Sequence, residues 1–220
     1  MEFLTGILDI FLHLDRHLNE IIALYGTWTY VILFLIIFAE TGLVVTPFLP
    51  GDSLLFAAGA LAATGPLDPV PLTLLLTLAA VLGDSANYAI GNYIGPRAFH
   101  NPNSRIFRKE YLDRTHRFYE KYGGRTIIIA RFVPIVRTFA PFVAGVGTMS
   151  YPRFMSFNVI GGMAWVIIFI WAGYWFGNIP AVQRNFGFVV IAIIILSVVP
   201  IGVEWVKHRR EQKKGALPSP

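Results

Sequence analysis

Four charged residues fall inside two apolar stretches of the chain. Glu40 and Asp52 lie in the first, AETGLVVTPFLPGDSLLFAAG, and Arg131 and Arg137 lie in the second, ARFVPIVRTFAPFVAG. Arginine donates paired hydrogen bonds to phosphate or carboxylate and keeps its charge at any working pH. An acid in a desolvated site can instead carry a proton near neutral pH. Two fixed cations beside two titratable acids therefore suit a binding site for an anion that protons could regulate.

Charged side chains in apolar segments are costly, at about 2.5–3.5 kcal/mol each at the centre of a membrane helix. Such residues usually face a cavity and pair with one another, so we expect the acid pair to lie close to the arginine pair. A simpler interpretation is that the four residues form ion pairs that only hold the protein together. For any single residue, both interpretations remain open.

A further polar patch, GDSANY, interrupts another apolar stretch and contains Asp84 and Asn87. Hydrogen bonding between helices and lining of the charged site explain this patch equally well. Thr138 follows Arg137 directly and is a third candidate for lining the site.

The composition indicates a membrane protein. Of the 220 residues, 55% are hydrophobic and only 14% are charged, whereas soluble domains carry about 25% charge. The absence of cysteine excludes disulfides and thiolate metal sites, and we expect no metal, no cofactor and no catalytic residue. The net charge of +5 does not predict nucleic-acid binding, because Lys and Arg cluster in two segments beside apolar runs.

Four segments are long and apolar enough to span a bilayer, which takes about 17–25 residues: 21–39, 70–94, 154–176 and 186–204. Two further segments, 43–64 and 126–148, are apolar but broken by proline and glycine. We expect the first break at Pro47, Pro50 and Gly51, and the second at Pro134, Pro141, Gly145 and Gly147.

The distribution of basic residues predicts the topology. Residues 97–125 hold eight Lys or Arg and the tail after 204 holds five, so both segments are expected in the cytoplasm. An even number of crossings must then separate them, and spans 154–176 and 186–204 already supply two. Segment 126–148 is therefore expected to enter and leave on the cytoplasmic side, and the Pro-Gly break suggests that 43–64 does the same from outside.

The prediction is an all-α integral membrane protein with four transmembrane helices and two opposed re-entrant helical hairpins in an inverted repeat. A faint repeat in the sequence agrees with this prediction. In the first half AAG (57–59) precedes GNYIG (91–95), and in the second half VAG (143–145) precedes GYWFG (173–177). Inverted repeats with broken helices are typical of secondary transporters.

The expected organisation has three parts. Residues 1–24 form an amphipathic helix, lying either in the membrane interface or against the protein's own core. Residues 25–205 form the membrane domain, which includes a cytoplasmic amphipathic segment at 97–125. Residues 206–220 form a basic cytoplasmic tail, so both termini are expected in the cytoplasm. The tryptophans, Trp165 among them, are interpreted as interfacial anchors.

Three motifs resemble the DedA family of bacterial inner-membrane proteins, which share a domain with eukaryotic lipid scramblases. They are FLPGD with the preceding Glu40, GDSANYAIGNYIG, and GGRTIIIARFVPIVRTFAPFVAGVGTMSYPRF. The resemblance extends over about residues 21 to 205. It implies two opposed re-entrant hairpins, and an acidic pair and an arginine pair needed for activity, which fall on Glu40, Asp52, Arg131 and Arg137. Family members are implicated in returning undecaprenyl phosphate from the outer to the inner leaflet and are tied to the proton-motive force.

The sequence and this resemblance together predict a flippase for a lipid phosphate, with undecaprenyl phosphate as the first candidate. Arg131 and Arg137 are expected to bind the phosphate. Glu40 and Asp52 are expected to bind a coupling proton or to balance the arginine charges. The lipid is the expected partner, and a homo-oligomer is compatible with the sequence.

Other functions remain open at this point. They are an energy-independent phospholipid scramblase, a proton/cation antiporter and a membrane assembly factor that transports nothing. A lipid-phosphate phosphatase is disfavoured, because the chain has no Cys and no G-x-S-x-G motif and its five His lie outside the apolar segments.

Overall fold

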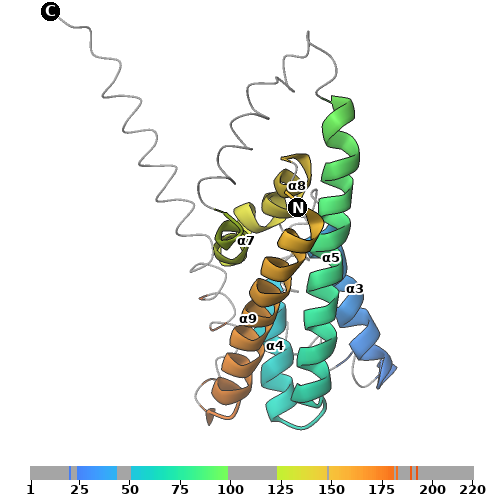
Figure 1. Ribbon diagram of the computed structural model, residues 1–220. Coiled ribbons are helices and arrows are strands. Elements are labelled where there is room, and N and C mark those ends of the chain that lie inside the picture. Colours follow the sequence, from blue (N-terminus) through green and yellow to red (C-terminus); the bar gives the residue numbers. More distant parts are fainter. Residues whose placement is uncertain are drawn as a thin grey trace, which may run out of the picture.

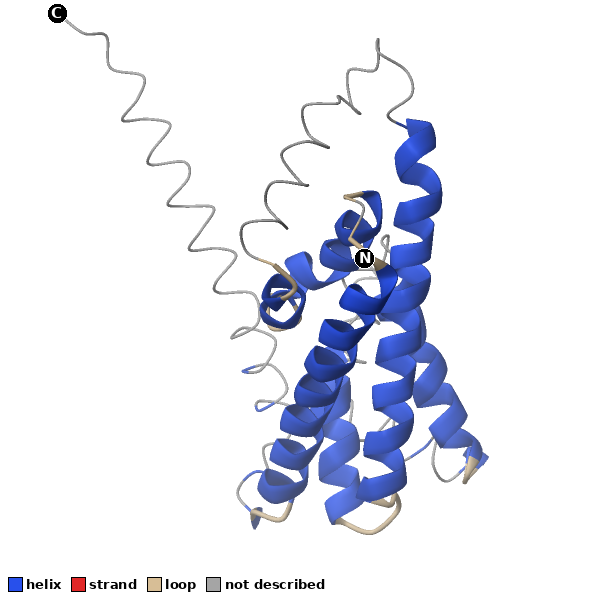
Figure 2. Ribbon diagram, viewed as in Figure 1, coloured by secondary structure: helices blue, strands red, loops and turns tan. Residues whose placement is uncertain are grey.

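The structure is a computed structural model that describes residues 24–43, 51–98, 123–147 and 149–180, and the single positions 20, 182, 189 and 192. Within these ranges the chain is helical and contains no strand (Figure 2). Several predicted segments lie wholly or mostly outside the described residues: the N-terminal helix 1–24, the basic segment 97–125, the span 186–204 and the tail 206–220.

Two long apolar helices form the frame of the protein. Helix α5 runs from Pro69 to Ala98 and helix α9 from Tyr151 to Gly177. At 1.5 Å per residue, their 30 and 27 residues extend over about 45 and 40 Å. Both exceed the hydrocarbon thickness of a bilayer, about 30 Å. They contain the predicted spans 70–94 and 154–176.

Three shorter apolar helices pack against this frame. They are α3 (Trp28–Gly42), α4 (Gly51–Ala63) and α8 (Pro134–Val146). Their 15, 13 and 13 residues reach only about 20 Å each. Helix α3 covers residues 28–39 of the predicted span 21–39 and continues to Gly42. Helix α4 accounts for the second arm of the predicted hairpin 43–64, whose residues 44–50 lie outside the described part of the chain.

The second broken segment consists of two helices, α7 (Arg125–Ala130) and α8, joined by residues 131–133. Pro134 begins α8, and Val133 before it is extended, with φ −117° and ψ 105°, as a following proline favours. Pro141, Gly145 and Gly147 were also expected at the break, but Pro141 and Gly145 lie inside α8 and Gly147 caps its C-terminus. A proline within a membrane helix is tolerated where neighbouring groups satisfy the carbonyl it leaves free, so Pro134 alone sets the break.

The first half of the chain contains α3, α4 and α5, and the second half contains α7, α8 and α9. The two halves exchange helices α4 and α8. Helices α5 and α9 pack side by side and run in opposite directions (Figure 1). Helix α4 packs along α9, and α8 packs along α5. Helices α4 and α8 therefore each contact mainly the long helix of the other half, whereas α3 packs along α5 of its own half.

Matched glycine contacts bring these helix pairs together. A Cβ atom at Gly173 would lie 2.0 Å from the carbonyl oxygen of Phe56, and one at Gly91 would lie 2.1 Å from that of Phe142. Between α4 and α9, Gly177 also lies against Ala60, and Gly59 lies against Ile170. Between α8 and α5, Gly95 lies against Val146, and Gly145 lies against Tyr88. Small residues spaced by four let membrane helices approach closely. The repeat in the sequence is thus also present in the packing.

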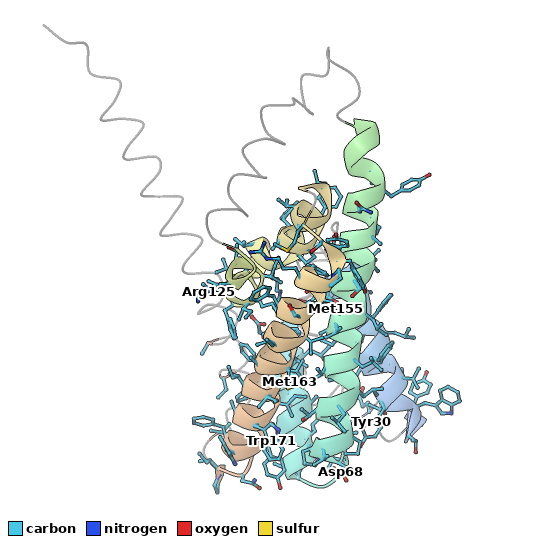
Figure 3. All side chains as sticks on the ribbon, in the orientation of Figure 1. Tyr30, Asp68, Arg125, Met155, Met163 and Trp171 are labelled. Carbon is cyan, nitrogen blue, oxygen red and sulfur yellow. The ribbon has the colours of Figure 1, made fainter. Side chains whose placement is uncertain are left out.

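The interior is built around α4, of which all but the last residue is buried. It packs with side chains from α3, α5 and α9, such as Leu33, Leu72 and Ile170. The outer surface is also apolar and includes Leu35, Leu74, Ile168 and Trp175. Met163 and Trp171 lie along α9 in Figure 3. Large apolar residues on both the inside and the outside of a helix bundle indicate lipid surroundings.

Candidate functional site

Arg137 joins the two halves of the protein. It lies in the first turn of α8, and its Nη1 atom donates a hydrogen bond to Oδ1 of Asp52 at 2.5 Å. Its Nη2 atom donates to Oε1 of Glu40. Asp52 belongs to the first turn of α4 and Glu40 to the last turn of α3. One guanidinium is therefore shared by two carboxyl groups from the other half of the chain. We call Arg137, Glu40 and Asp52 the Arg137 cluster.

The start of α4 is built around Glu40. The backbone N–H of Gly51 donates to Oε1 of Glu40 at 3.2 Å. A Cβ atom at position 51 would lie 2.1 Å from Oε2 of the same side chain, so no residue larger than glycine fits there without a shift. The free N–H groups of a helix N-terminus also favour a negative charge. This explains the glycine of the FLPGD motif.

Arg131 pairs with a different acid, Asp84, whereas one group shared with Glu40 and Asp52 was expected. Its Nη2 atom donates to Oδ2 of Asp84 and, at 2.5 Å, to Oδ1 of Asn158. Arg131 caps the C-terminus of α7, and its side chain is directed to α5 and α9. We call Arg131, Asp84 and Asn158 the Arg131 cluster.

One face of α9 holds the Arg131 side chain. Asn158, Gly161, Gly162 and Trp165 follow the i, i+3, i+4, i+7 spacing of a single helix face. A Cβ atom at Gly161 would lie 3.4 Å from Cδ of Arg131, and one at Gly162 would lie 3.4 Å from Cζ. The two glycines therefore leave room for the guanidinium between the polar side chains.

Trp165 is not an interfacial anchor. It is 1% exposed, and its indole N–H donates to Oδ1 of Asp52 at 2.8 Å. The centre of its ring lies 5.1 Å from Cζ of Arg137 and 5.9 Å from Cζ of Arg131. It lies in the middle of α9, on the same face as Asn158, and is close to both arginines.

The other two candidate residues connect helices. Asn87 on α5 donates through Nδ2 to the carbonyl oxygens of Thr41 at 3.1 Å and of Thr138 at 2.8 Å. Both Asn87 and Thr138 are buried. Asn87 thus ties the end of α3 to the start of α8, next to the residues of the Arg137 cluster.

The five charged residues form a buried group with unequal charge. The most exposed of them, Arg137, is only 9% exposed. Three carboxyl groups face two guanidinium groups, so the group carries one net negative charge when all five are ionised. Among the described residues, no hydrogen-bond partner is found for Oε2 of Glu40 or for Nε of either arginine. These atoms could accept a proton or donate to an anion. No set of three or more His, Cys, Asp or Glu in the described ranges is placed to hold a metal ion.

Asn158 and Trp165 were not among the residues predicted to form the site. Asn158 had a detectable signal, because it is an amide in the apolar run FNVIGGMAW. Trp165 had none, since a tryptophan in a membrane helix is ordinarily read as an apolar or interfacial residue. Only the packing of α9 against α4, α7 and α8 reveals its contacts with Asp52 and the two arginines.

Comparison with known proteins identifies the family. Residues 49–175 match the VTT domain. The chain is 56% identical to Protein DedA of Escherichia coli K12 over 218 residues, which cover 98% of this chain and 100% of that protein. It is 45% identical to Uncharacterized membrane protein Rv0364 of Mycobacterium tuberculosis H37Rv over 84% of this chain and 82% of that one.

A more distant relative is Inner membrane protein YqjA of E. coli K12, which is 35% identical over 90% of each chain. No solved structure matches the chain significantly. The extent and identity of these matches agree with the motifs around the charged residues. The chain therefore belongs to the DedA family, the membrane proteins that carry the VTT domain.

Proposed function

We propose that this protein moves a lipid phosphate from the outer to the inner leaflet of the bacterial inner membrane, and that protons drive the movement. Undecaprenyl phosphate is the substrate to test first. The observation that carries the proposal is the position of Arg137, buried between two helices and held there by Glu40 and Asp52. A guanidinium is well suited to bind a phosphate through paired hydrogen bonds.

The backbone around Arg137 also favours an anion. Helices α4 and α8 both begin at the Arg137 cluster, since Asp52 and Arg137 lie in their first turns and contact each other. In secondary transporters, the N-termini of broken helices point at anionic groups of the substrate. A lipid phosphate would bring its headgroup here, while its hydrocarbon tail stays in the bilayer.

The acids supply a means of control. With Glu40 and Asp52 ionised, Arg137 is occupied by two carboxylates, and an incoming phosphate would meet net negative charge. A proton on either acid removes that charge and weakens its hold on Arg137. Proton binding would thus prepare the site for the phosphate, and loss of the proton would favour phosphate release. Movement of one hairpin against the other would expose the site to each leaflet in turn.

We propose the topology deduced from the basic residues: four transmembrane helices, two re-entrant hairpins and both termini in the cytoplasm. Helices α4 and α8 fit the two hairpins, because about 20 Å is too short to cross the bilayer core. Helix α3 is similarly short, but the predicted span 21–39 begins before it, and residues 21–23 lie outside the described part of the chain. The opposite directions of α5 and α9, with exchanged short helices, fit an inverted repeat. One relative is named an inner membrane protein, which favours the same location here.

A second candidate function is proton/cation antiport. The excess of one carboxyl group over the guanidinium groups favours it, since a monovalent cation could balance that charge. In this case Arg131 and Arg137 would order the carboxyl groups and would not touch the substrate.

One reconstitution experiment separates these functions. Purified protein in proteoliposomes is offered labelled undecaprenyl phosphate or a labelled phosphatidylglycerol, each with and without a pH gradient. The proposal predicts inward movement of undecaprenyl phosphate alone, accelerated by the gradient. Equal movement of both lipids without a gradient indicates a scramblase. Gradient-driven cation flux with no lipid movement indicates an antiporter, and release of free phosphate indicates an enzyme.

A further inference from the structure

Trp165 touches both charged clusters. Its indole N–H donates to the same Asp52 oxygen that accepts from Arg137, at 2.8 and 2.5 Å respectively. Its ring lies within 6 Å of both guanidinium carbons, at 5.1 Å for Arg137 and 5.9 Å for Arg131. This is the distance range in which an arginine and an aromatic ring attract each other.

The clusters otherwise occupy different places. The Arg137 cluster joins α3, α4 and α8, whereas the Arg131 cluster joins α5, α9 and the end of α7. The two arginines sit on either side of the break before Pro134. Arg137 also interacts electrostatically with Arg131 and Asp84 across this separation, and Trp165 adds direct contacts with groups of both clusters.

We propose that Trp165 is the positioning residue that couples the two clusters, by sharing Asp52 with Arg137 and by contacting both guanidinium groups with one ring. This inference rests on the proposed function and takes both arginines to serve one lipid phosphate. When Asp52 is protonated or withdrawn, the indole loses its charged acceptor. The ring is then free to shift, and the shift changes the positions of both guanidinium groups, that of Arg131 as well as that of Arg137.

The burial of Trp165 supports this role over anchoring. Trp28 and Trp175 are 69% and 67% exposed, as expected for residues at a lipid surface, whereas Trp165 is 1% exposed. The neighbouring positions toward the start of α9 are Gly161 and Gly162, which leave Arg131 in contact with the helix. The indole is the only large side chain among the four positions of this face.

The first test measures transport by Trp165→Phe, which keeps an aromatic ring and removes the N–H donor. A hydrogen bond to a charged group is strong enough that its loss should slow transport by about tenfold or more. Trp175→Phe is the matched control, because it makes the same change on the lipid side of α9 and should transport at the wild-type rate. Equal rates for the two variants overturn the proposal.

The second test uses a spectroscopic signal that needs no substrate. A protein that retains Trp165 alone carries Phe at positions 28, 171, 175 and 205. In this background, Asp52→Asn and Asp84→Asn should each shift the emission of Trp165, because each change alters the charge around one of the two arginines that the ring contacts. Asp68→Asn is the control, since Asp68 is exposed and its carboxylate accepts from the backbone N–H of Val70 at the start of α5.

The two tests distinguish failure of the inference from failure of the proposed function. If the wild-type protein moves no lipid phosphate, the proposed function is wrong, and the emission measurement alone decides the inference. Shifts in both Asp52→Asn and Asp84→Asn then uphold the coupling of the clusters. A shift in Asp52→Asn alone places Trp165 in the Arg137 cluster only and overturns the coupling, as does no shift in either variant.

Discussion

Arg137 and Asp52 contact each other across the two halves of the protein, with Nη1 and Oδ1 2.5 Å apart. Each residue lies in the first turn of a short helix, and each short helix packs along the long helix of the other half. The contact therefore forms only when both halves are in place. A rearrangement of one half against the other must therefore alter it.

Arg137→Met should destabilise the protein by leaving two carboxyl groups buried without their partner. Removal of one member of a buried ion pair costs about 3–5 kcal/mol. Adding Glu40→Gln and Asp52→Asn to Arg137→Met should recover most of this loss. Unfolding in detergent, followed by circular dichroism, measures the free energy. Arg125→Met is the control, because Arg125 is exposed and should change stability by less than about 0.5 kcal/mol. A triple variant as unstable as Arg137→Met would argue against charge imbalance as the cause.

Asn158→Ala should weaken the Arg131 cluster. The amide accepts from Arg131 at 2.5 Å and donates to the carbonyl oxygen of Val81 at 3.0 Å, so its removal leaves buried groups without partners, at about 1–3 kcal/mol. Ser156→Ala on the same helix is the matched control, since its exposed hydroxyl bonds only within α9. The same unfolding assay applies, and equal stability of both variants would show that Asn158 does not hold Arg131.

Gly173→Ala and Gly91→Ala should destabilise the protein to a similar extent. The added methyl groups would lie 2.0 and 2.1 Å from the carbonyl oxygens of Phe56 and Phe142, and overpacking of this kind costs about 1–3 kcal/mol. Ile168→Ala on the lipid side of α9 serves as the control. A large loss in one glycine variant and none in the other would mean that the two helix crossings are not equivalent.

Several features of the fold were predictable because the physical signal was local. The length of two apolar segments predicted α5 and α9, and Pro134 marked the start of α8. The glycines of GNYIG and GYWFG predicted a repeat, and they do make the matched contacts. The prediction that Pro141 breaks the helix was wrong, since a second proline close to the first need not break the chain again.

The pairing of the charges could not be predicted in the same way. The sequence shows which residues are costly to bury, but not which partner each one meets. Charge balance alone suggested one group of two acids and two arginines. The exchange of short helices instead places Arg137 beside both Glu40 and Asp52, and Arg131 beside Asp84 and Asn158. These contacts depend on packing between segments far apart in the chain.

The proposed topology can be tested on a chain that has no cysteine of its own. Cysteines placed singly at positions 104 and 219 replace serines in the two basic segments. Both should resist an impermeant thiol reagent added to intact cells and react after the membrane is opened. Ready labelling of either position in intact cells would overturn the cytoplasmic assignment and, with it, the re-entrant path of the second hairpin.

The most direct test of the central claim is the uptake of labelled undecaprenyl phosphate into proteoliposomes by Arg131→Lys and Arg137→Lys, beside wild type and Arg125→Lys. Lysine keeps the charge but loses the planar pair of donors that meets phosphate oxygens. If the arginines bind the phosphate, both variants should slow uptake by about tenfold or more, whereas Arg125→Lys should match wild type. Wild-type uptake by both Arg131→Lys and Arg137→Lys would contradict phosphate binding and leave the arginines as ion-pair partners alone.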